Sequence, residues 1–583
     1  MRARHLLYAA SLPAIAFVAF GASVAATRVA PADTPLELAN APHCRVANIP
    51  AQVLSPDVIK AYEEAEPPLW DDLGILTFKV STAKPDAQLY FDQGLRMTAN
   101  FNHAEAGRAF RKAQKIDPDC ALCFAAEALV LGPNINAPMD PVAIPLAVAA
   151  AKKATELASK ASDKEKAIIE AIAVRYSDDP AAERPKLDAA FADAMVALSD
   201  KYPDDLELAT LAAEADMDTQ PWDYWEPGGA APKGRTADAL KRIEAVLAKA
   251  PNHPWAIHLY IHLVEASDKP ERAEPYADRL AALMPGAGHI VHMPSHIYHR
   301  VGRYQDALKS NADASKIDEE YITQTGATGV YSIGYYSHNV HFVLISAQLV
   351  GDRDLVLAQA DKLDKWLSNE VATAVPIAQP VKAAPYFAWA QYADADKLVS
   401  LPEPPGAAPY VKAHWHYARG IGLVGKKDLA AAREQADAIA KINAETDWSV
   451  MDAWGVPAKP VLQVAEDVLR ARAAQAESDD MAAIEMWKKA VEVQDTIPYM
   501  EPPYWYYPVR QSLGAALLKT GKADDAEKEF NAALAHARGS AWALYGLQQA
   551  AKMRKDAAAE TKATDNFTKA WRGDPAFLTL ERL

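Results

Sequence analysis

The chain has 583 residues, of which 50% are hydrophobic, 24% charged and 8% aromatic, and its formal net charge at pH 7 is -16. These fractions fit a soluble globular protein and exclude collagen-like, low-complexity and polytopic membrane classes, and the acidic balance argues against a nucleic-acid partner. The length exceeds what one compact core usually holds, so we expect several domains or an elongated array of repeats.

The first 26 residues have the order of a cleavable signal peptide. Arg2 and Arg4 precede an apolar run over 6–20, and small residues follow it. The run is too short for a bilayer span, which takes roughly 20 residues. We expect cleavage near Ala25 or Ala26, which leaves a periplasmic or secreted protein with no integral membrane segment. An uncleaved N-terminal anchor is the alternative.

A Pro-rich segment and a pair of cysteines come next. Residues 27–80 lack regular periodicity and are expected to form an arm that caps the fold that follows. Cys120 and Cys123 form a C-x-x-C motif, and export to an oxidising compartment permits a disulfide between them. Phe124 follows instead of histidine, which does not support haem attachment. A redox role or a soft-metal site, with Met139 nearby, is the alternative.

A spaced skeleton of small and aromatic residues recurs along the rest of the chain. It is most complete at Tyr90, Gly94, Ala106, Phe110, Ala113 and Pro118. Further copies lie at Gly302, Tyr304, Ala307 and Ala314, at Ala483, Trp487 and Ala490, and at Gly514, Gly521, Ala526, Phe530 and Ala533, with a weaker one at Gly425 and Ala430. Small residues at fixed places let two helices approach closely, and aromatic residues fill the gap to the next pair.

With this skeleton the chain resembles the tetratricopeptide repeat superfamily from about residue 81 to the end. The resemblance implies an all-α fold, a right-handed α-solenoid of helix-turn-helix repeats over 81–583. It also implies a concave groove that is lined by the first helix of each repeat and binds a ligand.

Eight of the 15 histidines lie between residues 254 and 341, a segment that we call the histidine stripe. The repeat register places three consecutive units at 254, 288 and 337 and sets the histidines on one face of each first helix. By the resemblance, this face lines the groove. Trp255 shares it, and so does Glu214 in the preceding unit.

Two histidine pairs in the stripe have the spacing of a metal site. His258 and His262 are four residues apart, and so are His292 and His296, so each pair can share an ion. Imidazole is a common ligand of zinc and copper, and Glu265 adds an oxygen ligand or an acceptor that orients a ring. Pairs on adjacent helices, about 9 Å apart axis to axis, are expected to converge on one copper or zinc ion. Further candidate ligands are His289, His299, His338 and His341.

Two interpretations without a metal stay open for the stripe. The rings can hydrogen-bond one another and hold a polar or anionic small ligand, or they can pack between helices as a polar core. Pro294 lies inside the helix predicted at 288–301 and is expected to kink or restart it, which would rotate His289 and His292 away from the others.

Two insertions lengthen the units that flank the stripe, near 219–233 and near 319–336. The second carries Tyr335 and Tyr336. Insertions in repeat arrays usually form loops on one face, often the binding face, so we expect lids or ligand-contacting walls. The alternative is that they only cover the apolar side of the solenoid.

A later unit places three side chains at groove positions: Lys412, Trp415 and Arg419. They can extend the groove as a cationic, stacking segment, or form a solvated face. The glycines between 420 and 425 spell G-x-G-x-x-G, but they fall on a predicted helix, so we reject a nucleotide-binding loop.

The sequence therefore predicts an exported repeat protein whose groove binds a ligand through the histidine stripe, with a transition metal. A metal-free scaffold that binds an extended peptide of a protein partner is the first alternative. A metal-dependent enzyme, in which the ion activates water or oxygen beneath the aromatic insertions, is the second. Neither G-x-S-x-G nor H-E-x-x-H occurs, so an enzyme is not favoured.

Overall fold

The computed structural model describes Lys60 and residues 62–583, and that part of the chain is built from α-helices with two isolated bridges and no strand. The predicted signal peptide, Cys44 and much of the arm lie outside the described residues. Among the helices described, none combines the length and the apolar character that a membrane crossing requires.

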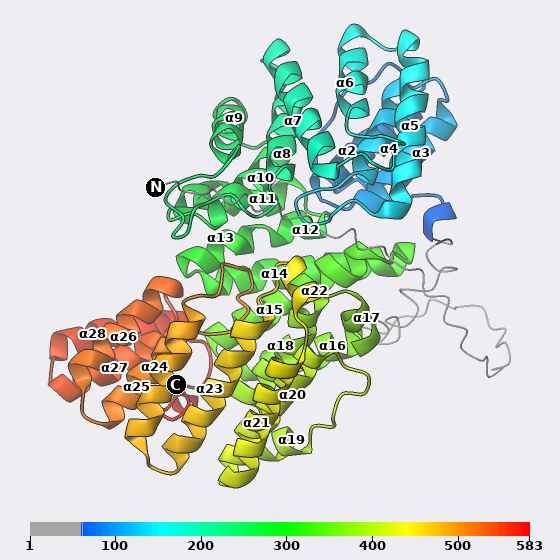
Figure 1. Ribbon diagram of the computed structural model, residues 1–583. Helices are drawn as coiled ribbons and strands as arrows, with labels where there is room; N and C mark the ends of the chain where they lie inside the picture. Colours follow the sequence, from blue (N-terminus) through cyan, green and yellow to red (C-terminus); the bar gives the residue numbers. More distant parts are fainter. Residues whose placement is uncertain (1–59, 61) are drawn as a thin grey trace, which may run out of the picture.

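The N-terminal helices pack as hairpins that occupy the upper part of Figure 1, coloured blue to green. They are α2 (Pro85–Ala99), α3 (His103–Ile116), α4 (Ala121–Leu131), α5 (Ile144–Leu157), α6 (Asp163–Ala173), α7 (Arg184–Lys201), α8 (Leu206–Asp218) and α9 (Thr236–Lys249). The described part of the Pro-rich arm binds to the first of them. The backbone N–H of Phe78 donates to Asp92 on α2, and Arg96 of α2 donates to the carbonyl of Leu76.

The middle helices carry the histidine stripe and run through the centre of the molecule in Figure 1. They are α10 (Pro254–Glu265), α11 (Glu274–Leu283), α12 (Gly288–His292), α13 (Pro294–Val301), α14 (Tyr304–Thr325), the π-helical turn η5 (Tyr331–Tyr336), α15 (Ser337–Val350) and α16 (Arg353–Trp366). Three of these helices begin at the residues that the repeat register predicts, 254, 288 and 337.

The C-terminal hairpins form the lower part of Figure 1. They are α17 (Asn369–Ala374), α18 (Ala378–Tyr392), α19 (Ala395–Ser400), α20 (Pro409–Gly425), α21 (Leu429–Glu445), α22 (Ser449–Ala453), α23 (Ala458–Ala476), α24 (Asp480–Gln494), α25 (Arg510–Lys519), α26 (Ala523–His536), α27 (Ala541–Arg554) and α28 (Ala557–Ala570). The glycines of the rejected nucleotide loop lie within α20, as predicted.

Glycine and phenylalanine interlock the two helices of a hairpin. A Cβ atom on Gly94 of α2 would lie 2.4 Å from the ring of Phe110 on α3. On α25, a Cβ on Gly514 would lie 2.8 Å from the ring of Phe530 on α26. The missing side chain is therefore what lets the ring fill the gap between the helices. The predicted all-α solenoid of helix-turn-helix repeats is confirmed.

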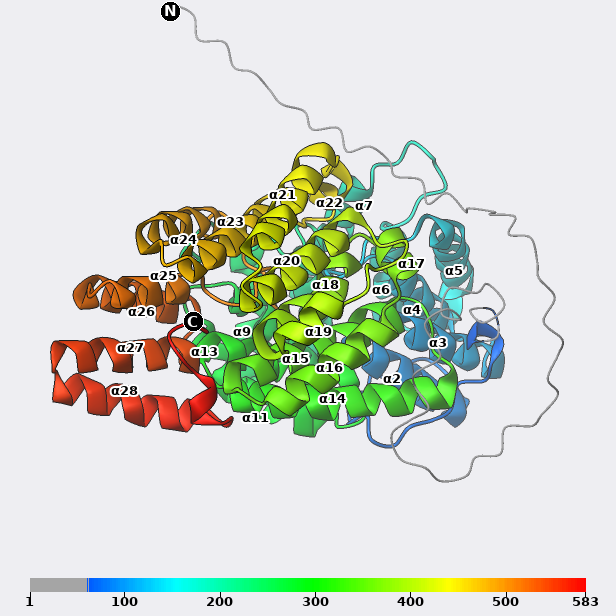
Figure 2. The ribbon, with the colours of Figure 1, turned by 90° about the horizontal axis from the view of Figure 1, so that it is seen from below.

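The array folds back on itself, so that the first and the last described segments both touch the middle helices. The turn at Gly302, after α13, lies against the carbonyl of Arg538, between α26 and α27. The indole N–H of Trp542 on α27 donates to the carbonyl of Gln348 on α15, 3.1 Å away. Figure 2 shows α27 beside the region of α13 and α15. From the N-terminal side, the N–H of Gly286 donates to the carbonyl of Asp72. This closure places the histidine stripe inside the molecule.

The two insertions differ in structure from each other. Residues 219–233 form an irregular segment, and Trp225 anchors it by donating to the carbonyl of Leu263 on α10, 2.7 Å away. The expectation of a loop at 319–336 is wrong over most of its length, because α14 continues to Thr325 and η5 leads directly into α15. Only 326–330 is left as a connection.

Candidate metal centre

Six histidines of the stripe form two groups of three in the centre of the molecule. The Nε2 atom of His258 lies 3.1 Å from the Nε2 atoms of both His262 and His289, and we call these three residues triad A. Triad B consists of His292, His296 and His338. Its members offer ligand atoms within 4.8 Å of one another, and two of them, His292 and His296, bring their Nε2 atoms to 2.8 Å.

These separations fit a metal ion held by three imidazoles. Two nitrogen ligands that each lie 2.0–2.1 Å from a tetrahedral ion are about 3.3 Å apart. The 3.1 Å separations in triad A are close to this value. Triad A therefore has the dimensions of a three-histidine metal site, and triad B gathers three ring nitrogens within 4.8 Å. Helices α10, α12, α13 and α15 supply the six rings.

Two of the three outer nitrogens of triad A are engaged by oxygen acceptors, and Nδ1 of His289 has no hydrogen-bond partner among the described residues. The Nδ1 atom of His258 is 2.7 Å from the carbonyl oxygen of Ala99 on α2. The Nδ1 atom of His262 is 2.9 Å from Oε1 of Glu265. Neither acceptor carries a hydrogen, so each ring places its hydrogen on Nδ1 and turns a lone pair on Nε2 toward the other ring.

Triad B repeats this arrangement with different acceptors. The Nδ1 atom of His296 is 2.7 Å from Oε2 of Glu265, and the Nδ1 atom of His292 is 2.5 Å from Oδ1 of Asn311. The amide nitrogen of Asn311 donates to the carbonyl of Ala307, which fixes its oxygen as the acceptor for the histidine. The Nε2 atoms of His292 and His296 thus face each other in triad B as well.

Burial and neighbouring charges set the protonation of these groups. Burial lowers the pKa values of His258, His289, His292 and His338 well below 6.5, and neighbouring imidazoles lower them further. Burial also lowers the pKa of His262. His296 is the exception, since the carboxylate of Glu265 outweighs burial and raises its pKa. Burial acts against the carboxylate of Glu265, but His296 and His262 hold its pKa well below the usual range. The triads are therefore mostly uncharged ligands beside one fixed negative charge.

Each triad packs against one phenylalanine that came from outside the predicted set. The ring of Phe101 lies 4.4 Å from that of His258, centroid to centroid, and 5.6 Å from that of His289. The ring of Phe342 lies 5.0 Å from that of His292 and 4.9 Å from that of His338. These apolar covers exclude water from the lone pairs, which strengthens any charge interaction inside.

Triad A is closed further by two aromatic residues of the predicted insertions. Trp222 meets the ring of His262 edge-on at 5.2 Å, and Tyr335 meets the ring of His289 at 4.7 Å. The hydroxyl of Tyr335 accepts a hydrogen bond from the amide of Asn136. The insertions therefore contribute walls to this site, as expected for Tyr335.

The structure corrects the grouping of the predicted ligands. Each i, i+4 pair lies with a third ring, His289 or His338, in a group of its own, which differs from the predicted grouping of both pairs around one point. Glu265 is an acceptor for two ligand rings instead of a ligand. Pro294 does interrupt the helix, and α13 begins there, but His289 and His292 stay inside the site.

Two histidines of the stripe stay outside the triads, and the stripe does not line an open groove. The Nε2 atom of His299 pairs with the hydroxyl of Ser346 at 2.9 Å, and His341 lies in the wall of a neighbouring cavity. Five of the six triad histidines are at most 2% exposed, and only His338 is partly accessible. The prediction of a concave, accessible surface fails because both ends of the chain cover these helices.

Four other predicted groove residues lie away from the triads. Lys412 pairs with Glu403, and the side chains of Trp415 and Arg419 donate to the carbonyls of Leu401, which caps α19, and of Val399 in α19. Tyr336 packs on Trp366 and donates to Glu319. Lys412, Trp415 and Arg419 do lie on one face of α20, as the repeat register predicts. That face packs against α19 and the connection after it, and does not line an open groove.

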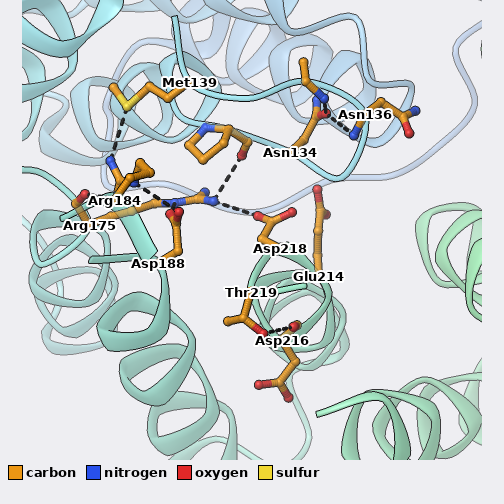
Figure 3. A network of polar contacts seen from close by, with 12 residues as sticks. Asn134, Asn136, Met139, Arg175, Arg184, Asp188, Glu214, Asp216, Asp218 and Thr219 are labelled. Atoms are coloured by element: carbon orange, nitrogen blue, oxygen red, sulfur yellow. Dashed lines mark hydrogen bonds and ion pairs between the residues drawn. The ribbon is translucent and has the colours of Figure 1, made fainter. Parts of the chain in front are cut away.

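Trp255 and Glu214 belong to a buried network behind triad A. The indole N–H of Trp255 donates to Glu214 at 2.8 Å. Figure 3 shows Glu214 beside Asp218 on α8, and Asp218 accepts from Arg175 at 2.7 Å. Burial, together with the charge of Asp218, raises the pKa of Glu214 to about 8. This network anchors the start of α10, from which triad A projects.

The cysteine pair forms a disulfide. The sulfur atoms of Cys120 and Cys123 are bonded at the start of α4. The suggested soft-metal site with Met139 is not formed, because the sulfur of Met139 accepts from Arg184 in the network of Figure 3.

Comparisons with known proteins identify no relative by sequence. No family model matches the chain, and no curated protein matches it. Among solved structures, yeast Tom70 is 12% identical and covers 84% of this chain and 90% of its own, with a TM-score of 0.28. The human IFIT1 dimer with m7Gppp-AAAA is 10% identical and covers 88% and 94%, with a TM-score of 0.32. The P58(IPK) TPR domain is 14% identical and covers 81% and 98%, with a TM-score of 0.20. We transfer no ligand or partner from them.

Proposed function

We propose that this protein binds two transition-metal ions, one on triad A and one on triad B. The observation that carries the proposal is the convergence of three imidazoles in each triad inside the molecule, with Nε2 atoms 3.1 Å apart in triad A and 2.8 Å apart in triad B. Lone pairs at this distance repel each other unless a cation lies between them. A metal ion satisfies all three nitrogens of a triad at once.

The two metal-free interpretations account for this geometry less well. In a polar core of histidines, a ring that receives a hydrogen bond on one nitrogen normally donates from the other. Here four rings use their Nδ1 hydrogens on oxygen acceptors outside the triads: His258, His262, His292 and His296. Their Nε2 atoms then point at one another and have few hydrogen-bond donors to accept from. An extended peptide has no access to the stripe, since the rings are enclosed.

The donor set favours copper or zinc. Three neutral imidazoles suit both ions, and such sites keep one coordination position open for water or a small ligand. Glu265 supports both triads, because its two oxygens orient His262 and His296 from the same carboxylate. We further propose that the protein acts after export, where the disulfide between Cys120 and Cys123 persists.

Metal analysis of protein purified without a histidine tag tests the proposal. We expect two equivalents of copper or zinc per chain in the wild type, and one equivalent in either His262→Ala or His296→Ala. The matched control is His414→Ala, which removes a buried histidine on α20 whose Nδ1 contacts the carbonyl of Tyr410. It should keep both equivalents.

A wild-type protein that holds no metal after dialysis against copper and against zinc would overturn the proposal. A single equivalent in the wild type that is lost in both variants would instead show that the six rings bind one ion, which contradicts two separate sites.

A further inference from the structure

A cavity of about 30 Å³ lies against triad B, between α15, α18 and the segment that follows α24. Its wall includes His338 of triad B and its neighbour His341. The remaining wall is mostly apolar, with Ile345, Ile377, Val381, Ala384, Phe387 and Met500 among its members. The cavity therefore adjoins triad B. A molecule inside it would lie next to His338, one of the proposed ligands of the ion on that triad.

One carboxyl group is placed among the apolar walls. Glu501 lines the cavity, is buried, and its Oε2 atom has no hydrogen-bond partner among the described residues. The nearest basic group is Nδ1 of His299, 4.0 Å away. Burial raises the pKa of Glu501 to about 7. An unpartnered buried polar group of this kind calls for an occupant.

The size of the cavity restricts that occupant. A water molecule needs roughly 10–15 Å³ of such volume, so 30 Å³ accommodates about two of them, or a molecule with two or three non-hydrogen atoms. Apolar walls disfavour an ion, because its hydration is not replaced. A small uncharged molecule with a weak acceptor atom fits both the walls and Glu501.

The cavity does not reach triad A. The cavity wall contains no residue of that triad, and Phe101, Trp222 and Tyr335 cover its rings. Among the triad ligands, partial accessibility is confined to His338 of triad B. The two sites therefore differ in access, although their ligands are alike.

We infer that this cavity admits a small uncharged ligand of the dioxygen or carbon monoxide class to the open coordination position of the ion on triad B. The inference rests on the proposed function, since it requires a bound ion. The ion on triad A is covered by Phe101, Trp222 and Tyr335 and does not bind such a small ligand.

Carbon monoxide binding to the copper-loaded, reduced protein tests the inference, with the copper content measured on the same samples. Infrared spectroscopy should show one bound carbon monoxide for every two copper ions. Ala384→Val narrows the cavity and should weaken carbon monoxide binding by about tenfold or more while leaving two copper ions bound. Ala390→Val makes the same chemical change on α18 outside the cavity wall and should leave the affinity unchanged.

A second variant tests the carboxyl group directly. Glu501→Gln keeps the shape of the side chain, changes its dipole, and should shift the C–O stretching frequency of the bound ligand. An unchanged frequency would remove Glu501 from the site.

The outcomes separate the two proposals. Protein that loads neither copper nor zinc overturns the proposed function and this inference together, whereas protein that loads zinc but no copper overturns this inference alone. Two copper ions without bound carbon monoxide, two carbon monoxide molecules per chain, or an Ala384→Val variant with unchanged affinity would each overturn the inference and leave metal binding intact.

Discussion

Glu265 is the single residue on which both triads depend. One oxygen accepts from His262 and the other from His296, and the hydroxyl of Tyr499 donates to the second oxygen at 3.0 Å. Its side chain is fully buried, and its pKa is held well below the usual range by the two rings. The carboxylate therefore sets the tautomer of one ring in each triad and supplies negative charge beside two proposed cations.

Replacing Glu265 with glutamine should weaken both metal sites together. An amide removes the negative charge beside both proposed ions, and its nitrogen must donate to one of the two rings, which also turns that ring's lone pair away from its ion. Loss of such an orienting partner typically costs 10–100-fold in metal affinity. Competition with a chelator, followed for each of the two equivalents, measures the effect.

Glu320→Gln is the control for this change, because Glu320 lies on the surface of α14 and its nearest cation is Lys316, 3.9 Å away. Its metal affinity should equal that of the wild type. A loss restricted to one equivalent in Glu265→Gln would contradict the shared role of the carboxylate.

At the scale of the element, the fold depends on how closely two helices of a hairpin approach. Gly94 on α2 faces Phe110 on α3, where an added Cβ would meet the ring at 2.4 Å. Gly107 also lies within a helix, α3, but the nearest atom to an added Cβ is the guanidinium end of Arg111 at 3.4 Å. Both glycines lie within helices, so replacement by alanine improves helix propensity at each position. Only the replacement of Gly94 adds a steric clash, and the difference between the two variants therefore measures that clash.

Gly94→Ala should destabilise the protein by about 1–3 kcal/mol, because the methyl group forces the ring of Phe110 to move in a packed core. Gly107→Ala should be neutral or stabilising by up to about 1 kcal/mol, since alanine is the better helix former. Urea denaturation of both variants measures the difference. Equal stability of the two variants would show that the glycine is not required by the packing of the hairpin.

At the scale of the whole molecule, distant parts of the chain complete the site. His258 is oriented by Ala99 on α2, and Glu265 accepts from Tyr499 in the segment that follows α24. Residues far from the stripe thus orient and cover the triads from opposite ends of the array. Metal binding should consequently stabilise the closed form of the entire array.

Adding the cognate metal should therefore raise the midpoint of thermal unfolding in one cooperative transition. An ion present at 100 times its dissociation constant contributes about 2.7 kcal/mol per site, so two sites contribute about twice that amount. His296→Ala should retain roughly half of this stabilisation, and His414→Ala should retain all of it. Differential scanning calorimetry with and without metal checks the prediction, and a metal-independent midpoint would contradict it.

The sequence by itself determined the hairpins and the residues that supply the ligands. Spacing of small and aromatic residues is local, so Gly94 and Phe110 predict a hairpin, and the register places the histidine-bearing helices at their observed starts. It also puts the histidines of α10 on one face, because a 3.6-residue period needs no knowledge of the neighbours.

Only the tertiary structure decided which rings meet and what encloses them. The grouping into triads depends on the angle between α10, α12 and α15, and the orientation of each ring depends on Ala99, Asn311 and Glu265, which no local pattern connects. Phe101 and Tyr499 reach the site because the array closes on itself. That closure buried the predicted groove, and it depends on contacts between residues hundreds of positions apart, which periodicity does not encode.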